Sequence, residues 1–122
     1  MLEEKLDVLV VADVIDEDTK KYILKASDFF RNEMKINDDT KVEVFLIHLA
    51  TAESRRRKNE VLDAKMEEII RNEVNNHHNF AECKEVWSRL SNYIGEEVYS
   101  ENELEFIYLH LLNLLEGDKD VS

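Results

Sequence analysis

The stretch FAECKEVWSRLSNYIG at residues 80–95 indicates the fold class of this 122-residue chain. Its apolar residues recur every three or four positions, the spacing that places side chains on one side of an α-helix. The stretch ends at Gly95, and glycine is favoured just beyond the last turn of a helix. The apolar positions are Phe80, Cys83, Val86, Trp87, Leu90 and Ile94. We therefore expect an amphipathic helix that packs against other helices.

Other parts of the chain repeat this spacing. Residues 17–34, 40–58, 61–74 and 100–116 each carry an apolar stripe, and residues 2–12 carry a weaker one because they are rich in β-branched valine. The sequence contains no proline and only two glycines, so little interrupts helix formation. The pattern predicts an all-α protein, a five- to six-helix bundle forming a single domain over residues 1–122.

Signals for helix ends support these boundaries. Asp16 is a favourable N-cap, and Thr40–Glu43, Asn79–Glu82 and Ser100–Glu103 have the form of capping boxes. Gly117 is expected to stop the last helix, and the five residues after it to be frayed. The polar runs at 37–39 and 75–78 mark further breaks between helices.

The charge of the chain excludes some functions. Its 16 basic and 28 acidic residues give a formal net charge of −12, which repels phosphate backbones and anionic membranes. We therefore expect no direct binding to nucleic acid. The apolar run at residues 6–15 is too short to span a membrane and contains two aspartates, so neither a membrane anchor nor a signal peptide is expected. The single cysteine, Cys83, suits a reducing, cytoplasmic environment.

Two histidines lie within apolar helical stretches and have polar companions at defined spacing. Val44, His48, Ala52 and Arg55 share one face of the helix expected over 40–58, because offsets of four and seven residues return to the same side. Each imidazole is nucleophilic when neutral, and a pKa near 7 keeps a neutral fraction available. His48 is therefore a candidate nucleophile.

The last stretch repeats this arrangement around His110. Glu103, Ile107, His110 and Leu114 form one face, and Asn113 lies one turn after the histidine. For either histidine taken alone, a buried ring satisfied by a neighbouring group is the simpler interpretation. Glu103 also fits a capping box beginning at Ser100, Arg55 fits a helix end favoured by cations, and Asn113 fits a solvent-facing position.

The two histidine segments together resemble a known family. HLATAESR at residues 48–55 is similar to the first histidine motif of the PTS-regulation domain, in which an arginine follows the histidine by seven positions. ELEFIYLHLLN at residues 103–113 is similar to its second motif, in which an acidic residue precedes the histidine by seven positions and an asparagine follows by three. The resemblance covers about residues 17–116 and leaves a short N-terminal helical extension.

This resemblance implies a helical bundle that is usually dimeric. In the family, proteins of the sugar phosphotransferase system phosphorylate the histidines, which controls a transcription regulator. His48 and His110 would be the phosphoryl acceptors, with Arg55, Glu103 and Asn113 as supporting residues. The implied partners are a phosphocarrier protein or a sugar-specific transporter subunit, a second copy of the chain in a homodimer, and a separate transcription regulator. No enzyme activity, cofactor or metal is expected.

Two features depart from the family pattern. Many members carry aspartate immediately before the first histidine, whereas this chain has Ile47. The family domain also commonly occurs in tandem beside an RNA- or DNA-binding module, and this chain has one copy and no such module. Any control of transcription is therefore expected to pass through a protein partner. The alternative is a structural interaction domain of the same fold that is not phosphorylated.

Rival functions lack their usual signals. Phosphotransfer bundles of two-component relays carry Lys and Gly soon after the histidine, and neither motif here does. An enzyme on a helical bundle would need paired carboxylates, a glycine-rich phosphate loop or a metal site. His77 and His78 are adjacent and fit a polar turn better than a metal site with Glu73, because neighbouring helical positions point about 100° apart. Cys83 is expected in the core.

Overall fold

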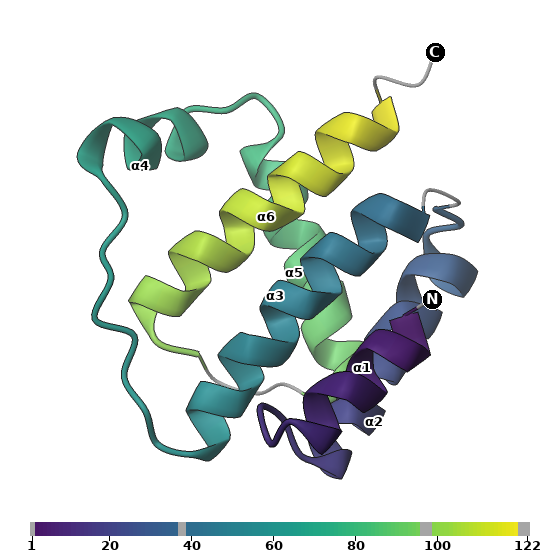
Figure 1. The fold of residues 1–122 in the computed structure, drawn as a ribbon. Coiled ribbons are helices and arrows are strands. Elements are labelled where there is room, and N and C mark those ends of the chain that lie inside the picture. Colours follow the sequence, from purple (N-terminus) through teal and green to yellow (C-terminus); the bar gives the residue numbers. More distant parts are fainter. Residues whose placement is uncertain (1, 37–38, 96–98, 120–122) are drawn as a thin grey trace. The chain divides into compact units, whose positions relative to one another are not determined.

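The computed structural model describes residues 2–36, 39–95 and 99–119, and helices are the regular elements in these ranges (Figure 1). The prediction of an all-α protein with five to six helices is confirmed. The helices are α1 (Leu2–Val11), α2 (Glu17–Asp28), the π-helix η1 (Phe29–Glu33), α3 (Asp39–Arg57), α4 (Glu68–Asn75), α5 (Phe80–Ile94) and α6 (Glu101–Lys119). Among the described helices, none combines the length and the apolar character that a membrane span requires.

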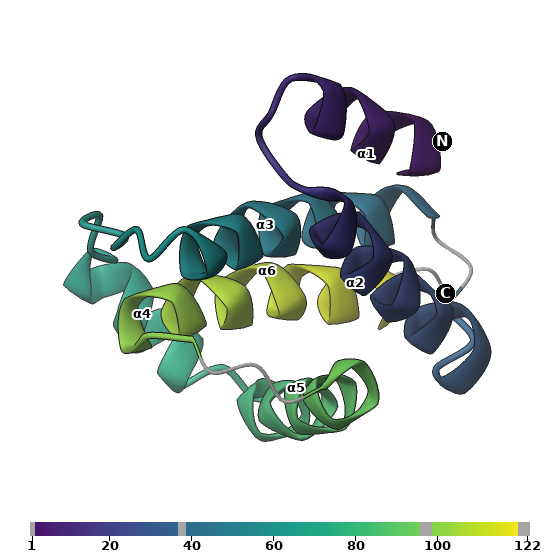
Figure 2. The ribbon, with the colours of Figure 1, turned by 90° about the horizontal axis from the view of Figure 1, so that it is seen from below.

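The helices form two compact units, Met1–Val61 and Leu62–Ser122. The first contains α1, α2, η1 and α3. Within it α2 packs along α3, and Figure 2 shows α1 as a further layer on these two helices. The second contains α4, α5 and α6, and both α5 and α4 pack against α6.

Large aromatic and aliphatic side chains fill the core of the first unit. The rings of Phe29 and Phe30 meet edge-to-face at 5.5 Å, and those of Phe30 and Phe45 at 5.6 Å. Leu6 is the one fully buried residue that the described part of α1 contributes. Burial of each such side chain is worth about 1.5–3 kcal/mol. The apolar stripes of the sequence therefore hold this unit together.

The predicted cap at Asp16 is confirmed. The backbone N–H of Thr19 donates to the Asp16 carboxylate over 2.6 Å, which satisfies one of the free amides at the start of α2. The capping box expected at Thr40 is wrong, because α3 begins one residue earlier at Asp39. The Glu43 carboxylate pairs instead with Lys5 on α1. The predicted break falls partly on Asn37 and Asp38, which lie outside the described residues.

Two helices of the first unit end at left-handed residues that are not glycine. Asp13 has a φ of 62° after α1, and Asn59 has a φ of 57° after α3. The amides of Val14 and Glu60 then donate to carbonyls five residues back, over 2.9 and 2.8 Å. This hydrogen-bond pattern satisfies the last carbonyls of a helix and turns the chain away from its axis.

In the second unit, α5 follows the expected boundaries. Gly95 ends it with a φ of 118°, in the region that only glycine adopts easily. Ser100 caps α6, because its hydroxyl accepts a hydrogen bond from the Glu103 amide over 3.3 Å. The capping box predicted at Asn79 is wrong, because Asn79 precedes α5 without a capping bond from its side chain. The backbone N–H of Asn79 donates to His77 instead.

Two other predicted boundaries are also wrong. The helix expected over residues 61–74 is present only as α4, and residues 60–67 form no regular element. Gly117 does not stop the last helix, since α6 continues to Lys119. A single glycine lowers helix stability by only about 1 kcal/mol, which the rest of a long helix can offset.

Candidate functional site

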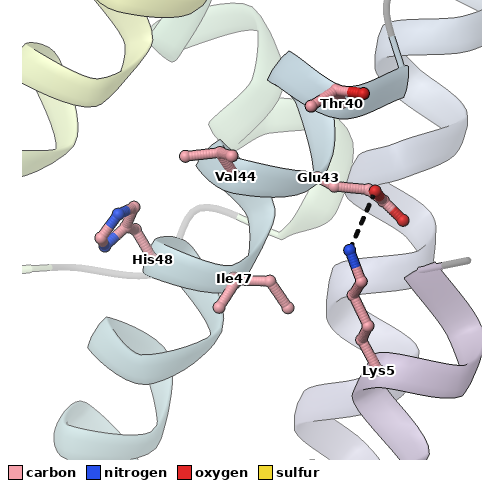
Figure 3. Close-up of a pocket in the computed structure, with 6 residues that line it drawn as sticks. All are labelled: Lys5, Thr40, Glu43, Val44, Ile47 and His48. Atoms are coloured by element: carbon pink, nitrogen blue, oxygen red, sulfur yellow. Dashed lines mark hydrogen bonds and ion pairs between the residues drawn. The ribbon is translucent and has the colours of Figure 1, made fainter.

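His48 lies in the middle of α3 with its side chain exposed. It borders a shallow hollow of about 240 Å³ between α1 and α3. The lining residues are Lys5, Thr40, Glu43, Val44, Ile47 and His48 (Figure 3). Val44, one turn before the histidine, is 53% exposed, so the surroundings of the ring are both accessible and apolar.

The two sides of this hollow differ in character. Figure 3 shows His48 and Val44 pointing to the same side, away from the ion pair of Lys5 and Glu43. In that pair the Lys5 ammonium lies 3.3 Å from the Glu43 carboxylate. The neutral apolar side therefore surrounds the imidazole, and the charged side fastens α1 to α3.

Partial desolvation lowers the pKa of His48 below the ordinary value of about 6.5. At neutral pH the ring is therefore mainly neutral, and a neutral imidazole carries a lone pair on one of its nitrogens. The hydroxyl of Thr51 donates to the backbone carbonyl of His48 over 2.9 Å, so this contact leaves the imidazole nitrogens unaffected. Exposure and neutrality together make His48 chemically suitable as a nucleophile.

Arg55 lies on the same side of α3 as His48, two turns later, and is half-buried. The axial separation is about 10 Å at the standard helical rise. The next two arginines are engaged by a residue that the sequence analysis missed. The Glu53 carboxylate is fully buried and accepts bonds from Arg56 at 2.8 Å and from Arg57 at 2.6 Å. The Glu-x-x-Arg-Arg spacing was the available signal for this cluster.

Ser54, next to Glu53 in the chain, joins α3 to the loop after α1. Ser54 donates its hydroxyl to the Val14 carbonyl over 2.7 Å. Although desolvation opposes it, the hydrogen bond and negative charge of Glu53 raise the pKa of Arg57. The basic run of the sequence is therefore largely part of the fold of this unit, and it does not form a uniformly free anion-binding surface.

His110 lies on α6 and is half-buried. Glu103 and Ile107 on its predicted face are buried, with 6% and 4% of their surface exposed. Asn113 is exposed and therefore lies off the buried stripe. The Glu103 amide is bonded to Ser100 at the helix start, so Glu103 has a structural role in addition to its place in the motif.

The adjacent histidines occupy the turn between α4 and α5. The Nδ1 atom of His77 accepts the Asn79 amide over 3.0 Å, so its neutral ring carries the proton on Nε2. That nitrogen lies 3.7 Å from a Glu116 carboxylate oxygen, and the ring stacks on His78 at 4.5 Å. With one nitrogen bonded and the other protonated, His77 is unsuited to nucleophilic attack.

The remaining candidates of the sequence were Cys83 and a metal site. Desolvation raises the pKa of the buried Cys83 to about 12, and its thiol donates to the Tyr108 carbonyl, so Cys83 is an unreactive core residue. Among the residues that the structure describes, no three potential ligands come together as a metal site.

Comparison of the chain with protein-family models, with curated proteins and with solved structures gave no match in any of the three.

Proposed function

We propose that this chain is a cytoplasmic regulatory module of the PTS-regulation type. In this proposal, proteins of the phosphotransferase system phosphorylate it on His48 and His110. Its phosphorylation state then controls transcription or sugar metabolism through a protein partner. One observation carries the proposal: the imidazole of His48 is exposed and its pKa is lowered, so a neutral nucleophile is accessible to a phosphoryl donor.

The transfer is an exchange of one N–P bond for another. A neutral imidazole nitrogen of His48 attacks phosphorus while the N–P bond of a phosphohistidine on the donor breaks. The other ring nitrogen of His48 keeps its proton, and the donor imidazole departs with the electron pair of the broken bond. The reaction needs no metal ligand from this chain, because the donor is already activated.

The phosphoryl group changes the charge of the site by close to two negative units. At His48 this charge attracts Arg55 of a neighbouring subunit more readily than Arg55 of the same helix, about 10 Å away. At His110 it repels Glu103, which precedes it by two turns on α6. Both effects alter packing between subunits of a homodimer, and such a change is the signal that a protein partner would detect.

Phosphorylation in vitro tests this function. The chain is incubated with phosphoenolpyruvate and the general phosphotransferase components, and in a parallel sample with phosphoramidate, a small donor. We expect an acid-labile gain of one phosphoryl group at His48 and one at His110, located by mass spectrometry at neutral pH. His48→Ala and His110→Ala should each remove one group, whereas His78→Ala, at an exposed turn position, should remove none.

The alternative function is an interaction domain of the same fold that is not phosphorylated. Ile47 before the first histidine and the exposed Val44 beside it favour this alternative, because both suit an apolar protein contact. Absence of label from both donor types at both histidines would establish the alternative in place of phosphorylation.

A further inference from the structure

Residues 62–67 are extended in the structure although their sequence favours a helix. Leu62, Ala64, Lys65, Met66 and Glu67 are all good helix formers, and neither proline nor glycine occurs here. Their apolar residues also continue the helical spacing of α4. Figure 1 nevertheless shows this stretch as an uncoiled path that leads into α4. Local preference therefore does not explain the extended form.

The start of α4 supplies no local stop signal either. Glu67 occupies the N-cap position with an extended backbone, and its side chain makes no capping bond. The first bond of the helix runs from the Arg71 amide to the Glu67 carbonyl over 2.9 Å. A helix that begins without a cap can gain further turns at its start unless other contacts prevent it.

Two side chains provide such contacts, which we call the anchoring bonds. The side-chain amide of Asn102 donates to the backbone carbonyl of Leu62 over 3.2 Å. The guanidinium of Arg71 donates to the backbone carbonyl of Met66 over 3.3 Å. In a helix extended backward these two carbonyls would accept the amides of Met66 and Ile70. The anchoring bonds thus occupy the acceptors that an additional turn would use.

Arg71 is itself fixed in place by α6. Its Nε lies 2.5 Å from one Glu105 carboxylate oxygen, and its Nη2 lies 3.4 Å from the other. This paired geometry orients the guanidinium toward the Met66 carbonyl. The Met66 side chain is buried, which adds an apolar contact to the extended form. Two neighbouring apolar side chains remain in solvent in this form, because Val61 is 77% exposed and Ile69 is 72% exposed.

We propose that Leu62–Glu67 is a two-state regulatory segment that the anchoring bonds hold in its extended state. Release of Asn102 and Arg71 lets the segment join α4 as a continuous helix. The path from Leu62 to Glu68, which can span up to about 20 Å when extended, is then about 9 Å long. The segment is the start of the second compact unit, directly after Val61, the last residue of the first, so this change alters the length of the chain between Val61 and α4. This inference does not depend on histidine phosphorylation.

Removal of the anchoring donors in the full chain tests the proposal. Asn102→Asp keeps the shape of the side chain without its donor, and Arg71→Met keeps an apolar stem without the guanidinium. In the double variant we expect the ¹³Cα NMR shifts of Leu62–Glu67 to move to helical values, with slower amide exchange. The matched control, Asn92→Asp with Arg89→Met on exposed positions of α5, should leave these shifts unchanged.

Two further variants keep the test decisive. Glu67→Pro added to the double variant should return the segment to non-helical shifts. Glu67 has a φ of −62° in the structure, which proline also adopts, whereas in the new helix proline could not donate to the Asp63 carbonyl. An alanine pair, Asn102→Ala with Arg71→Ala, should reproduce the gain of helix by a different chemical route. Unchanged shifts in both pairs, or a loss of α4 itself in either, would overturn the proposal, since the anchoring bonds would then support α4 rather than restrain it.

Discussion

Glu53 and Arg57 form an ion pair along α3 in which the carboxylate is fully buried and the guanidinium reaches it at 2.6 Å. Arg56, the residue before Arg57, binds the same carboxylate at 2.8 Å. The arginines remain about one-third exposed, so solvent screens only their side of the cluster. Removal of this carboxylate would leave the charges of Arg56 and Arg57 unpaired near the core, and unpaired charges there are costly.

Replacement of Glu53 should therefore destabilise the first unit. We expect Glu53→Gln to lower the free energy of unfolding by about 2–3 kcal/mol, below the range for fully buried pairs because the arginines are partly solvated. Urea denaturation followed by circular dichroism measures this change. Glu60→Gln, at an exposed position just after α3, is the matched control and should change stability by less than about 0.5 kcal/mol. Equal effects of the two substitutions would contradict the role of the cluster.

Asp16 should make stability depend on pH. The nearby Thr19 side chain and the backbone N–H of Thr19, which donates to the carboxylate, lower the pKa of Asp16 below its ordinary value of 3.8. Because the folded pKa is the lower one, this stabilisation is present above about pH 3.8 and is lost as the pH falls through the folded pKa. Asp16→Asn keeps a capping oxygen but does not titrate. The stability of the natural chain should therefore decrease relative to this variant between about pH 4 and pH 2, and parallel curves would contradict the assignment.

The helices that could be predicted from the sequence are those whose apolar spacing and end signals agree. For α5, both the stripe beginning at Phe80 and the left-handed Gly95 match the structure. The ends of α1 and α3 depend on Asp13 and Asn59 in left-handed conformation. Such residues are uncommon in that region, and composition alone does not mark them. Residues 62–67 differ for another reason, because side chains distant in sequence, Asn102 among them, hold them extended.

For the candidate site, the sequence could predict which residues share a face of a helix, but not which face is exposed to solvent. Helical spacing correctly grouped Glu103 with Ile107 on a buried face of α6. Spacing does not report which face is solvated, so the exposure of His48 became visible only in the structure. The pairing of Lys5 with Glu43 was equally inaccessible, because 38 residues separate the partners in the chain.

His48 should titrate at a lower pH than an unstructured histidine. Desolvation disfavours its charged form and lowers its pKa in the folded chain. The associated stability is therefore present above about pH 6.5 and decreases as the pH falls through the folded pKa. NMR observation of the ring protons in the folded chain and in the urea-unfolded chain measures both pKa values. Val44→Asp, which places a carboxylate one turn away, should raise the folded value, whereas Val8→Asp on the exposed side of α1 should raise it less. A folded pKa at or above the unfolded one would contradict the desolvated surroundings of the ring.

Lys35 should be replaceable by glycine with a gain in stability. It follows η1 with a φ of 54°, a left-handed conformation that costs a side chain with a Cβ atom about 1–2 kcal/mol. Glycine removes that cost but increases the entropy of the unfolded chain by about 0.4–1 kcal/mol. We therefore expect Lys35→Gly to raise the free energy of unfolding by about 0.5–1 kcal/mol, as measured by urea denaturation. Lys21→Gly, at an exposed position within α2, should instead lower it by about 1 kcal/mol, because the backbone there is helical. A loss of stability in both variants would show that Lys35 makes contacts whose value exceeds the strain of its backbone.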